Sequence, residues 1–325
     1  MGAANRVALL FVDGFGWGRD DSSVNPGWSY GGTLLRLPPL SSTTRPAADQ
    51  SAVDASAGPS AIADATFTGA PIRLDNGAWA VPLDACLGVP GLPQSATGQT
   101  TLLTGINAAA VQGRHLSGFP GPTLRALLLE HSLLLQLRRA GRRPVFFNTY
   151  RTPFFSLPRA RQLCMSATTV ANLAADLPFF DVPDMAAGRS LYQDFTGEEL
   201  RRLGFAAPLL TPAEAGACLA RNLPRYDFLL YEYFRTDRAG HTADRAAAED
   251  ELRRLDAFLA AILAELPLDT LLLWCSDHGN LEDLTVATHT RNPVPLLAWG
   301  PGAREFMTGL TGLDQVAPAI LRVLG

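Results

Sequence analysis

Five short, continuous apolar runs constrain the fold more than any other feature of this 325-residue sequence. Such runs are typical of strands covered on both faces, as in a parallel sheet. Helical patterns lie between them, at residues 122–141, 211–223 and 244–266. Strands that alternate with helices predict an α/β fold with a mostly parallel central sheet and helices on both faces. The predicted strands are residues 7–13, 144–150, 226–234, 269–277 and 293–300.

The composition predicts a single domain with a substantial core. Apolar residues make up 47% of the chain, and the formal net charge is −4. A chain of this length suffices for one large domain, so we expect residues 1–325 to form one unit. Residues 19–80 are expected to form loops or a flap, and residues 107–225 to include a small elaboration of the core. Residues 40–70 are small and polar, which indicates a surface loop, with a flap over a ligand as the alternative.

The charge pattern argues against nucleic acid and anionic membranes as partners, because the mildly acidic chain contains no basic run. No stretch approaches the ~20 uncharged apolar residues of a transmembrane helix. The N-terminus enters a predicted strand almost at once and leaves no room for a cleavable signal peptide. The four cysteines are scattered, which is typical of reduced thiols, so we expect a cytoplasmic protein. Nothing in the sequence indicates an oligomeric state.

Acidic and imidazole side chains gather next to the predicted strands. Ligands of open α/β sheets bind beyond the carboxyl ends of the strands. Aspartate and histidine together form the ligand set that borderline divalent metals prefer, and six candidates exceed one tetrahedral site, so two metals are expected. Two metals ~4 Å apart suit in-line displacement at phosphorus. The six candidates are Asp13, Asp237, His241, Asp277, His278 and His289.

Each candidate also has an ordinary structural interpretation. Asp13 could form a turn with the glycine that follows it, Asp237 could cap a helix, and His289 could be a satisfied loop histidine. The aspartate-histidine pair at 277–278 is a weak signal by itself. Their shared position at one predicted edge of the sheet favours a metal site over independent coincidences.

The segment GLPQSATGQTTLLTG, residues 91–105, contains a candidate nucleophile. A hydroxyl-rich turn leads there into an expected helix, so Ser95 or Thr97 would lie near a helix N-terminus. Backbone N–H groups and the helix dipole favour a phosphate at that position. Metal coordination makes the alkoxide of such a hydroxyl accessible. The alternative is a plain capping turn, which is the commoner use of these residues.

Several of these motifs together resemble the alkaline phosphatase superfamily. The segments VDGFG, QSATGQTTLLTG, DRAGHT, SDHGNLED and HTRNPVPLL stand in the order of its metalloenzyme branch. That branch holds cofactor-independent phosphoglycerate mutase and phosphopentomutase. The resemblance covers residues 7–18, 93–106 and 226–300 and leaves the middle of the chain unassigned. It implies an alkaline-phosphatase-like catalytic domain with its metal site at the C-terminal strand ends.

Carried over by position, the resemblance implies two metal sites. Asp237, His241 and His289 would hold one divalent ion, and Ser95 matches the nucleophile because Gly98 follows it by three residues. The ions would be zinc or manganese, with magnesium as a further alternative. Asn280 would support a ligand or contact the phosphate. The second ion would be held by Asp13, Asp277, His278 and the hydroxyl of Ser95.

Differences between this sequence and the family's motifs bear on the choice between a phosphohydrolase and a phosphomutase. Gln99 stands where the mutases usually have histidine, the chain contains no lysine, and residues 107–225 leave no room for their large inserted domain. The sequence therefore favours a phosphohydrolase that acts on a small phosphorylated monoester or diester through a phosphoserine intermediate. A phosphomutase is the first alternative, and a metal-binding protein without activity is the second. Charge on the phosphate would be met by arginines near the edge, for which the candidates are Arg151, Arg235, Arg238 and Arg291.

Overall fold

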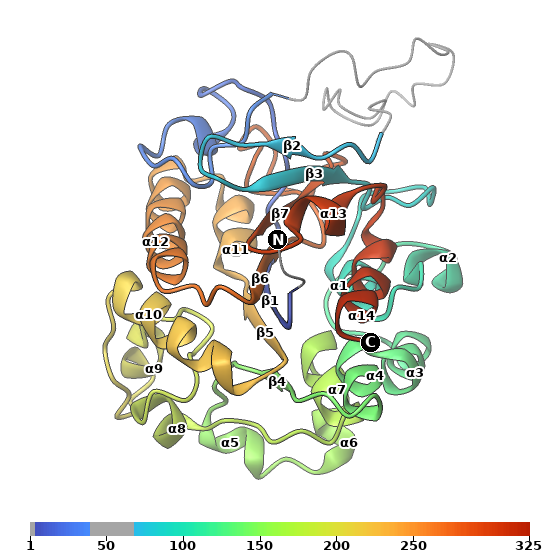
Figure 1. The fold of residues 1–325 in the computed structure, drawn as a ribbon, viewed down its shortest axis with the longest axis vertical. Helices are drawn as coiled ribbons and strands as arrows, with labels where there is room; N and C mark the ends of the chain where they lie inside the picture. The colour runs from blue at the N-terminus through green and yellow to red at the C-terminus, as the bar shows by residue number, and fades with distance from the viewer. Residues whose placement is uncertain (1–3, 40–67) are drawn as a thin grey trace.

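The computed structural model describes residues 4–39 and 68–325, and their centre is one seven-stranded sheet (Figure 1). The strand order is β2-β3-β7-β6-β1-β5-β4. All five predicted apolar runs contribute a strand, so the predicted sheet is confirmed. The strands are β1 (Arg6–Val12), β2 (Ile72–Arg73), β3 (Trp79–Leu83), β4 (Pro144–Phe146), β5 (Phe228–Tyr233), β6 (Thr270–Cys275) and β7 (Val294–Trp299).

The directions of the strands determine which loops share an edge. Strands β4, β5, β1 and β6 run parallel, whereas β7 is antiparallel to β6 and β3 is antiparallel to β7. The sheet is thus mostly parallel, as predicted, with an antiparallel margin that includes the short strand β2. Because β7 runs backwards, its first residue lies at the same edge as the last residues of β1, β5 and β6.

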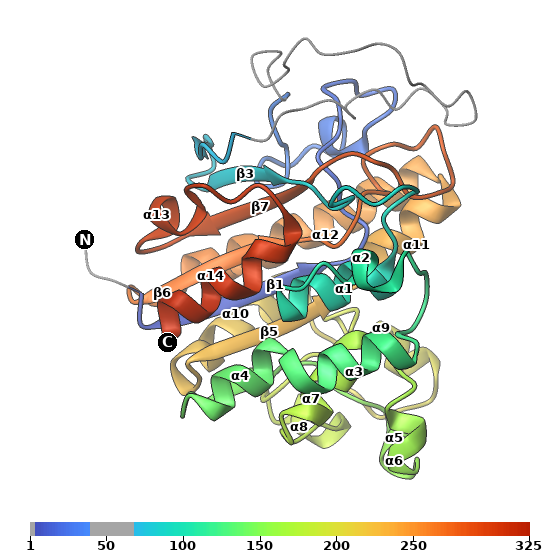
Figure 2. The same ribbon diagram turned by 90° about the vertical axis from the view of Figure 1, so that its right-hand side faces the viewer.

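Helices cover both faces of the sheet (Figures 1 and 2). The helices are α1 (Ser95–Thr104), α2 (Ala108–Gln112), α3 (Pro122–His131), α4 (Leu133–Arg139), α5 (Thr152–Phe155), α6 (Arg159–Gln162), α7 (Ala167–Ala174), α8 (Val182–Ala186), α9 (Glu198–Arg202), α10 (Pro212–Asn222), α11 (Arg235–Thr242), α12 (Arg245–Ala264), α13 (Ala303–Met307) and α14 (Val316–Leu324), with 3₁₀ turns at Pro26–Trp28, Leu223–Arg225 and Leu313–Gln315.

Strand β1 shows why the sheet is covered twice. Its alternate residues point to opposite faces, and both sets are buried. Val7, Leu9 and Phe11 pack in a core with residues of α1, α3, α4, α7 and α14. Leu10 and Val12 pack in a second core with residues of α10 and α12. A strand enclosed in this way must be apolar throughout, which is the pattern of the sequence.

Two predicted elements differ from the structure. The helix expected over residues 122–141 is split at Ser132, whose extended backbone (φ −60°, ψ 142°) ends α3 and begins α4. The strand expected over residues 144–150 ends at Phe146. Two residues later, the side chain of Asn148 takes the place of backbone pairing with β5. Its amide donates to the Glu232 carbonyl (2.8 Å), and its oxygen accepts from the Glu232 N–H (2.9 Å).

Two expectations about the organisation of the chain stay predictions. Most of the segment 40–70 lies outside the described residues, so the loop and flap interpretations both stay predictions. The single-domain organisation with an elaboration within 107–225 likewise stays a prediction. None of the helices in the described ranges is both long and apolar enough to cross a membrane.

Candidate active site

The candidate site lies at the edge where β1, β5 and β6 end, where β7 begins and where α1 starts (Figure 2). All six metal-ligand candidates and the proposed nucleophile meet there. Asp13 follows β1, Asp237 and His241 lie on α11 after β5, and the pair at 277–278 follows β6. His289 precedes β7, and Ser95 is the first residue of α1. Residues that are far apart along the chain therefore form one cluster.

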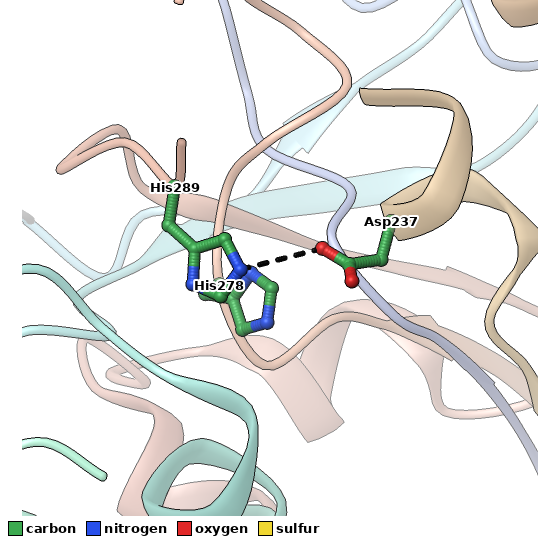
Figure 3. A group of neighbouring side chains, drawn as sticks. All are labelled: Asp237, His278 and His289. Atoms are coloured by element: carbon green, nitrogen blue, oxygen red, sulfur yellow. Dashed lines mark ion pairs between the residues drawn. The ribbon is translucent and has the colours of Figure 1, made fainter. Parts of the chain in front are cut away.

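One half of the cluster consists of Asp237, His241 and His289. Asp237 and His241 are four residues apart on one helix, which places both on the same face. The Nε2 atoms of His241 and His289 lie 3.2 Å apart, and each lies 3.4 Å from an oxygen of Asp237. Figure 3 shows Asp237 and His289 directed toward each other.

The hydrogen bonds of the two histidines indicate what lies between them. Nδ1 of His289 is 2.9 Å from the Pro93 carbonyl, and Nδ1 of His241 is 3.0 Å from the Ala287 carbonyl. A carbonyl only accepts, so both Nδ1 atoms are assigned the proton and both Nε2 atoms carry lone pairs when the rings are neutral. Two lone pairs that face each other at 3.2 Å repel, and a cation between them removes the repulsion.

The other half of the cluster surrounds the Nε2 atom of His278. This atom lies 3.0 Å from Oγ of Ser95, 3.2 Å from Oδ1 of Asp13 and 3.5 Å from Oδ2 of Asp277. The two halves are adjacent, because the rings of His278 and His289 stack with centroids 3.7 Å apart (Figure 3). Donor atoms of Asp237, His278 and His289 also lie within 4.8 Å of one another, so His278 stands between the two halves.

Burial and mutual repulsion of the carboxylates in this cluster favour the binding of cations. Burial, and then repulsion from neighbouring carboxylates, raises the pKa of Asp13 and of Asp277 well above the ordinary value. Burial also opposes ionisation of Asp237, but His289 and His278, when their rings are protonated, lower its pKa to about 2 through a hydrogen bond and positive charge. Oδ1 of Asp13 and Oδ2 of Asp277 are buried with no hydrogen-bond partner among the described residues. These carboxylates and imidazoles fit two divalent ions.

Three further side chains, Gln99, Asn280 and Glu282, support the candidate ligands through hydrogen bonds. The sequence suggested this role only for Asn280. Gln99 donates to Oδ2 of Asp13 (3.1 Å), so the residue that replaces the family's histidine contacts a candidate ligand. Asn280, which the sequence did suggest, donates to Oδ1 of Asp237 (2.7 Å). Glu282 is the third, and its carboxylate accepts hydrogen bonds from both sides of the site.

Glu282 is 5% exposed and joins the loop after β1 to the segment before β7. Its Oε2 accepts from the N–H groups of Gly16 (3.0 Å) and Asn280 (2.7 Å). Its Oε1 accepts from the Thr290 hydroxyl and from the Asn292 amide (2.9 Å). Little in the sequence indicated this role for Glu282. Its place in SDHGNLED was the only signal, and acidic residues in loops are usually solvated.

The remaining candidates lie in different surroundings. The Thr97 hydroxyl contacts the Gln94 carbonyl (3.1 Å) and the Leu116 N–H (3.2 Å), which is a structural role. Arg235 pairs with buried Glu251 (2.5 Å), and exposed Arg291 donates to the Gly91 carbonyl (3.2 Å). Only Arg151 and Arg238, of the four arginines, line the cavity that opens beside Ser95.

Comparison with known proteins supports the family resemblance. Residues 213–325 match the model of the Metalloenzyme superfamily. The 2,3-bisphosphoglycerate-independent phosphoglycerate mutase of Desulforudis audaxviator is 33% identical over 125 residues, which are 36% of this chain and 25% of that protein. The enzyme of the same name from Thermomicrobium roseum is 33% identical over 132 residues, 37% of this chain and 25% of that protein. The chain thus matches about a quarter of the length of these relatives.

Solved structures of alkaline phosphatases share the fold over nearly the whole chain. The cold-active enzyme from a psychrophilic Shewanella has a TM-score of 0.51 at 12% identity and covers 98% of this chain and 100% of its own. The Thermus thermophilus enzyme has a TM-score of 0.51 at 13% identity and covers 100% of this chain and 92% of its own. These structures show an alkaline-phosphatase-like fold, and the predicted resemblance to the metalloenzyme branch is confirmed for residues 213–325. The matched family model covers the C-terminal third of the chain, and the relatives matched by sequence are named as phosphoglycerate mutases.

Proposed function

We propose that this chain belongs to the alkaline phosphatase superfamily and hydrolyses a small phosphate ester through a phosphoserine intermediate on Ser95, with two divalent metal ions. The observation that supports this most strongly is the convergence on the Nε2 atom of His278. The Ser95 hydroxyl lies 3.0 Å from that atom, next to buried oxygens of Asp13 and Asp277 that lack hydrogen-bond partners among the described residues. A hydroxyl among metal ligands is the arrangement that nucleophilic attack on phosphorus requires.

The bound ions would supply charge for the attacking and leaving oxygens and would favour the ionised form of Ser95. The chain's own residues provide the positions. Ser95 is the first residue of the ten-residue helix α1, where the positive end of the helix dipole favours an incoming phosphate. Gly98 lets α1 approach the loop after β6, because a Cβ there would lie 2.7 Å from the Asp277 carbonyl oxygen. Gln99 keeps one oxygen of Asp13 occupied and leaves the other facing His278.

A phosphomutase is the second candidate, because the curated relatives carry that name. Their match is confined to about a quarter of their own length, so it supports the chemistry of the metal site more than the fate of the phosphoryl group. A mutase must also hold the dephosphorylated product away from water until it is rephosphorylated. The absence of lysine from the chain and the short segment 107–225 favour transfer to water.

The test is phosphate release from a panel of phosphomonoesters and phosphodiesters with added Mn²⁺ or Zn²⁺. We expect metal-dependent release that falls on the order of 10³-fold or more in Ser95→Ala, because the nucleophile is lost. Ser132→Ala is the matched control, since the same hydroxyl is removed from a buried position between α3 and α4. No release by the intact, metal-loaded protein would refute hydrolysis. Conversion of 3-phosphoglycerate without net phosphate would then identify the mutase.

A further inference from the structure

A cavity of about 490 Å³ opens directly beside the proposed nucleophile. Its lining includes Ser95, Asp13 and Gln99 together with residues from 118–119, 146–169, 192–193 and 232–238. The volume lies within the ~300–1,000 Å³ that is typical of small-molecule sites. Most of this lining belongs to the middle of the chain, where the sequence carries no recognised motif. The cavity is therefore where the part of a substrate beyond its phosphoryl group would lie.

The walls of this cavity present apolar surface to solvent. Phe119 is 64% exposed and Leu157 is 38% exposed, although both are large apolar residues. Phe154 and Phe234 line the same space. One exposed apolar residue is ordinary, but two exposed ones in the lining of a concave site that also contains Phe154 and Phe234 indicate a surface that an apolar ligand covers.

An aromatic pair in the wall is held rigidly. The ring centroids of Tyr150 and Phe154 lie 4.3 Å apart, and the Tyr150 hydroxyl is 2.6 Å from the Thr169 hydroxyl. Tyr150 is therefore fixed at both its ring and its polar end, so the wall is shaped before a ligand arrives. Aromatic rings favour edge or offset contacts with a further ring.

Several polar groups of the lining are paired within the protein. Asn148 pairs with the backbone of Glu232, and Gln193 donates to Glu199 (2.9 Å). Arg238 lies over the ring of Phe234, 4.7 Å from its centroid. The arginines Arg151 and Arg238 in the lining would meet the charge of the phosphate, whereas an aromatic group would cover the exposed ring of Phe119.

We infer that this cavity binds the leaving group of the phosphate ester and that the group is aromatic. The inference rests on the proposed hydrolase and names its substrate class. The apolar wall and the nucleophile belong to one continuous cavity, so an ester can place its phosphoryl group at Ser95 and its ring against Phe119 and Phe154 together.

The test compares 2-phenylethyl phosphate with ethyl phosphate, because both release primary alcohols and differ mainly in the ring. We expect kcat/KM to be about 10-fold or more higher for the phenylethyl ester, as burial of one ring implies. Phe119→Ala should reduce this ratio several-fold. Phe155→Ala is the matched control, since Phe155 is 45% exposed on the same short helix as Phe154 but does not line the cavity.

Binding separates the pocket from the reaction. The matching phosphonates, 2-phenylethylphosphonate and ethylphosphonate, are titrated calorimetrically into the metal-loaded protein. A preference for the phenyl compound that Phe119→Ala weakens supports the pocket even if no ester is hydrolysed, and only the hydrolase would then be refuted. Equal kcat/KM and equal affinity within each pair would overturn the aromatic site while leaving hydrolysis intact. An equal loss in Phe119→Ala and Phe155→Ala would also overturn it.

Discussion

The substitution Glu282→Gln tests whether one buried carboxylate holds the candidate metal site together. Glu282 accepts from the N–H groups of Gly16 and Asn280 and from the side chains of Thr290 and Asn292. The two backbone donors cannot turn away, so the single carbonyl oxygen of glutamine must accept from them. The Thr290 hydroxyl can rotate to accept from the new amide, but the Asn292 amide then faces another donor.

The magnitude follows from these four bonds. Hydrogen bonds to a charged group contribute ~1.5–3 kcal/mol and neutral ones ~0.5–1.5 kcal/mol, so each backbone donor loses about 1 kcal/mol. A further ~1 kcal/mol comes from Asn292. We therefore expect Glu282→Gln to lower the free energy of unfolding by about 2–3 kcal/mol. Because the carboxylate positions the loops that carry the ligands, metal affinity should also fall by ~10–100-fold.

The free energy of unfolding is measured in urea on protein freed of metal with a chelator. Metal affinity is then measured by titrating the folded protein with Mn²⁺ or Zn²⁺. Glu130→Gln is the matched control, because the Glu130 side chain is 75% exposed and the same change there should stay within ~0.5 kcal/mol. If Glu282→Gln were as stable as Glu130→Gln and bound metal equally well, the assigned role of Glu282 would be wrong.

Two further predictions concern charge at the site. Burial raises the pKa of Glu232 to about 7, above the ~4.3 of an unfolded chain. The free energy of unfolding of the metal-free protein should therefore fall by ~3 kcal/mol as the pH rises from about 4.5 to about 7, because the unfolded chain ionises first. Glu232→Gln should remove that loss, measured as the difference between the urea stabilities of the two proteins at pH 5 and pH 8. Metal at 100 times its Kd should stabilise the protein by ~2.7 kcal/mol for each ion bound. Asp277→Asn should reduce this gain, yet be no less stable than the parent without metal, because burial and the neighbouring Asp13 disfavour an ionised carboxylate at this position.

Each of these predictions has a contrary result. Equal pH dependence of the parent and Glu232→Gln would show that Glu232 is not protonated in the folded state. The exposed residue Asp176, whose side chain is 84% exposed, provides the control Asp176→Asn for the metal experiment. A metal-free Asp277→Asn that was strongly destabilised, with Asp176→Asn unaffected, would mean that Asp277 stabilises the fold without a cation.

Local patterns predicted most of the framework. Continuous apolar runs become buried strands because both faces of the sheet are covered, and helix α10 begins at Pro212 after a threonine cap as its sequence indicates. The split at Ser132 was missed because Leu-rich sequence on both sides continues the helical pattern across it. Strand β3 was missed because its WAVPL sequence contains a proline, which is tolerated beside β7 near the margin of the sheet.

The support of the candidate site was beyond the reach of local patterns. Glu282 and Gly16 are 266 positions apart, and no periodicity in either segment reports that contact. The proton positions of His241 and His289 depend on carbonyls supplied by Ala287 and Pro93, which are likewise set by packing. The aromatic cavity draws on segments with no common motif, so it became visible only when the chain was folded.

The sequence by itself determined which residues could serve as ligands and that most of them follow strands. It could not determine the direction of the last strand, because an apolar run reads the same whether it pairs parallel or antiparallel. His289 precedes β7, so a parallel β7 would have placed it at the opposite edge of the sheet from Asp13 and Asp277. The antiparallel pairing of β7 with β6 brings His289 to within 3.4 Å of Asp237. Tertiary structure decided this, because hydrogen bonding between strands, and not the pattern within one, sets the direction of a strand.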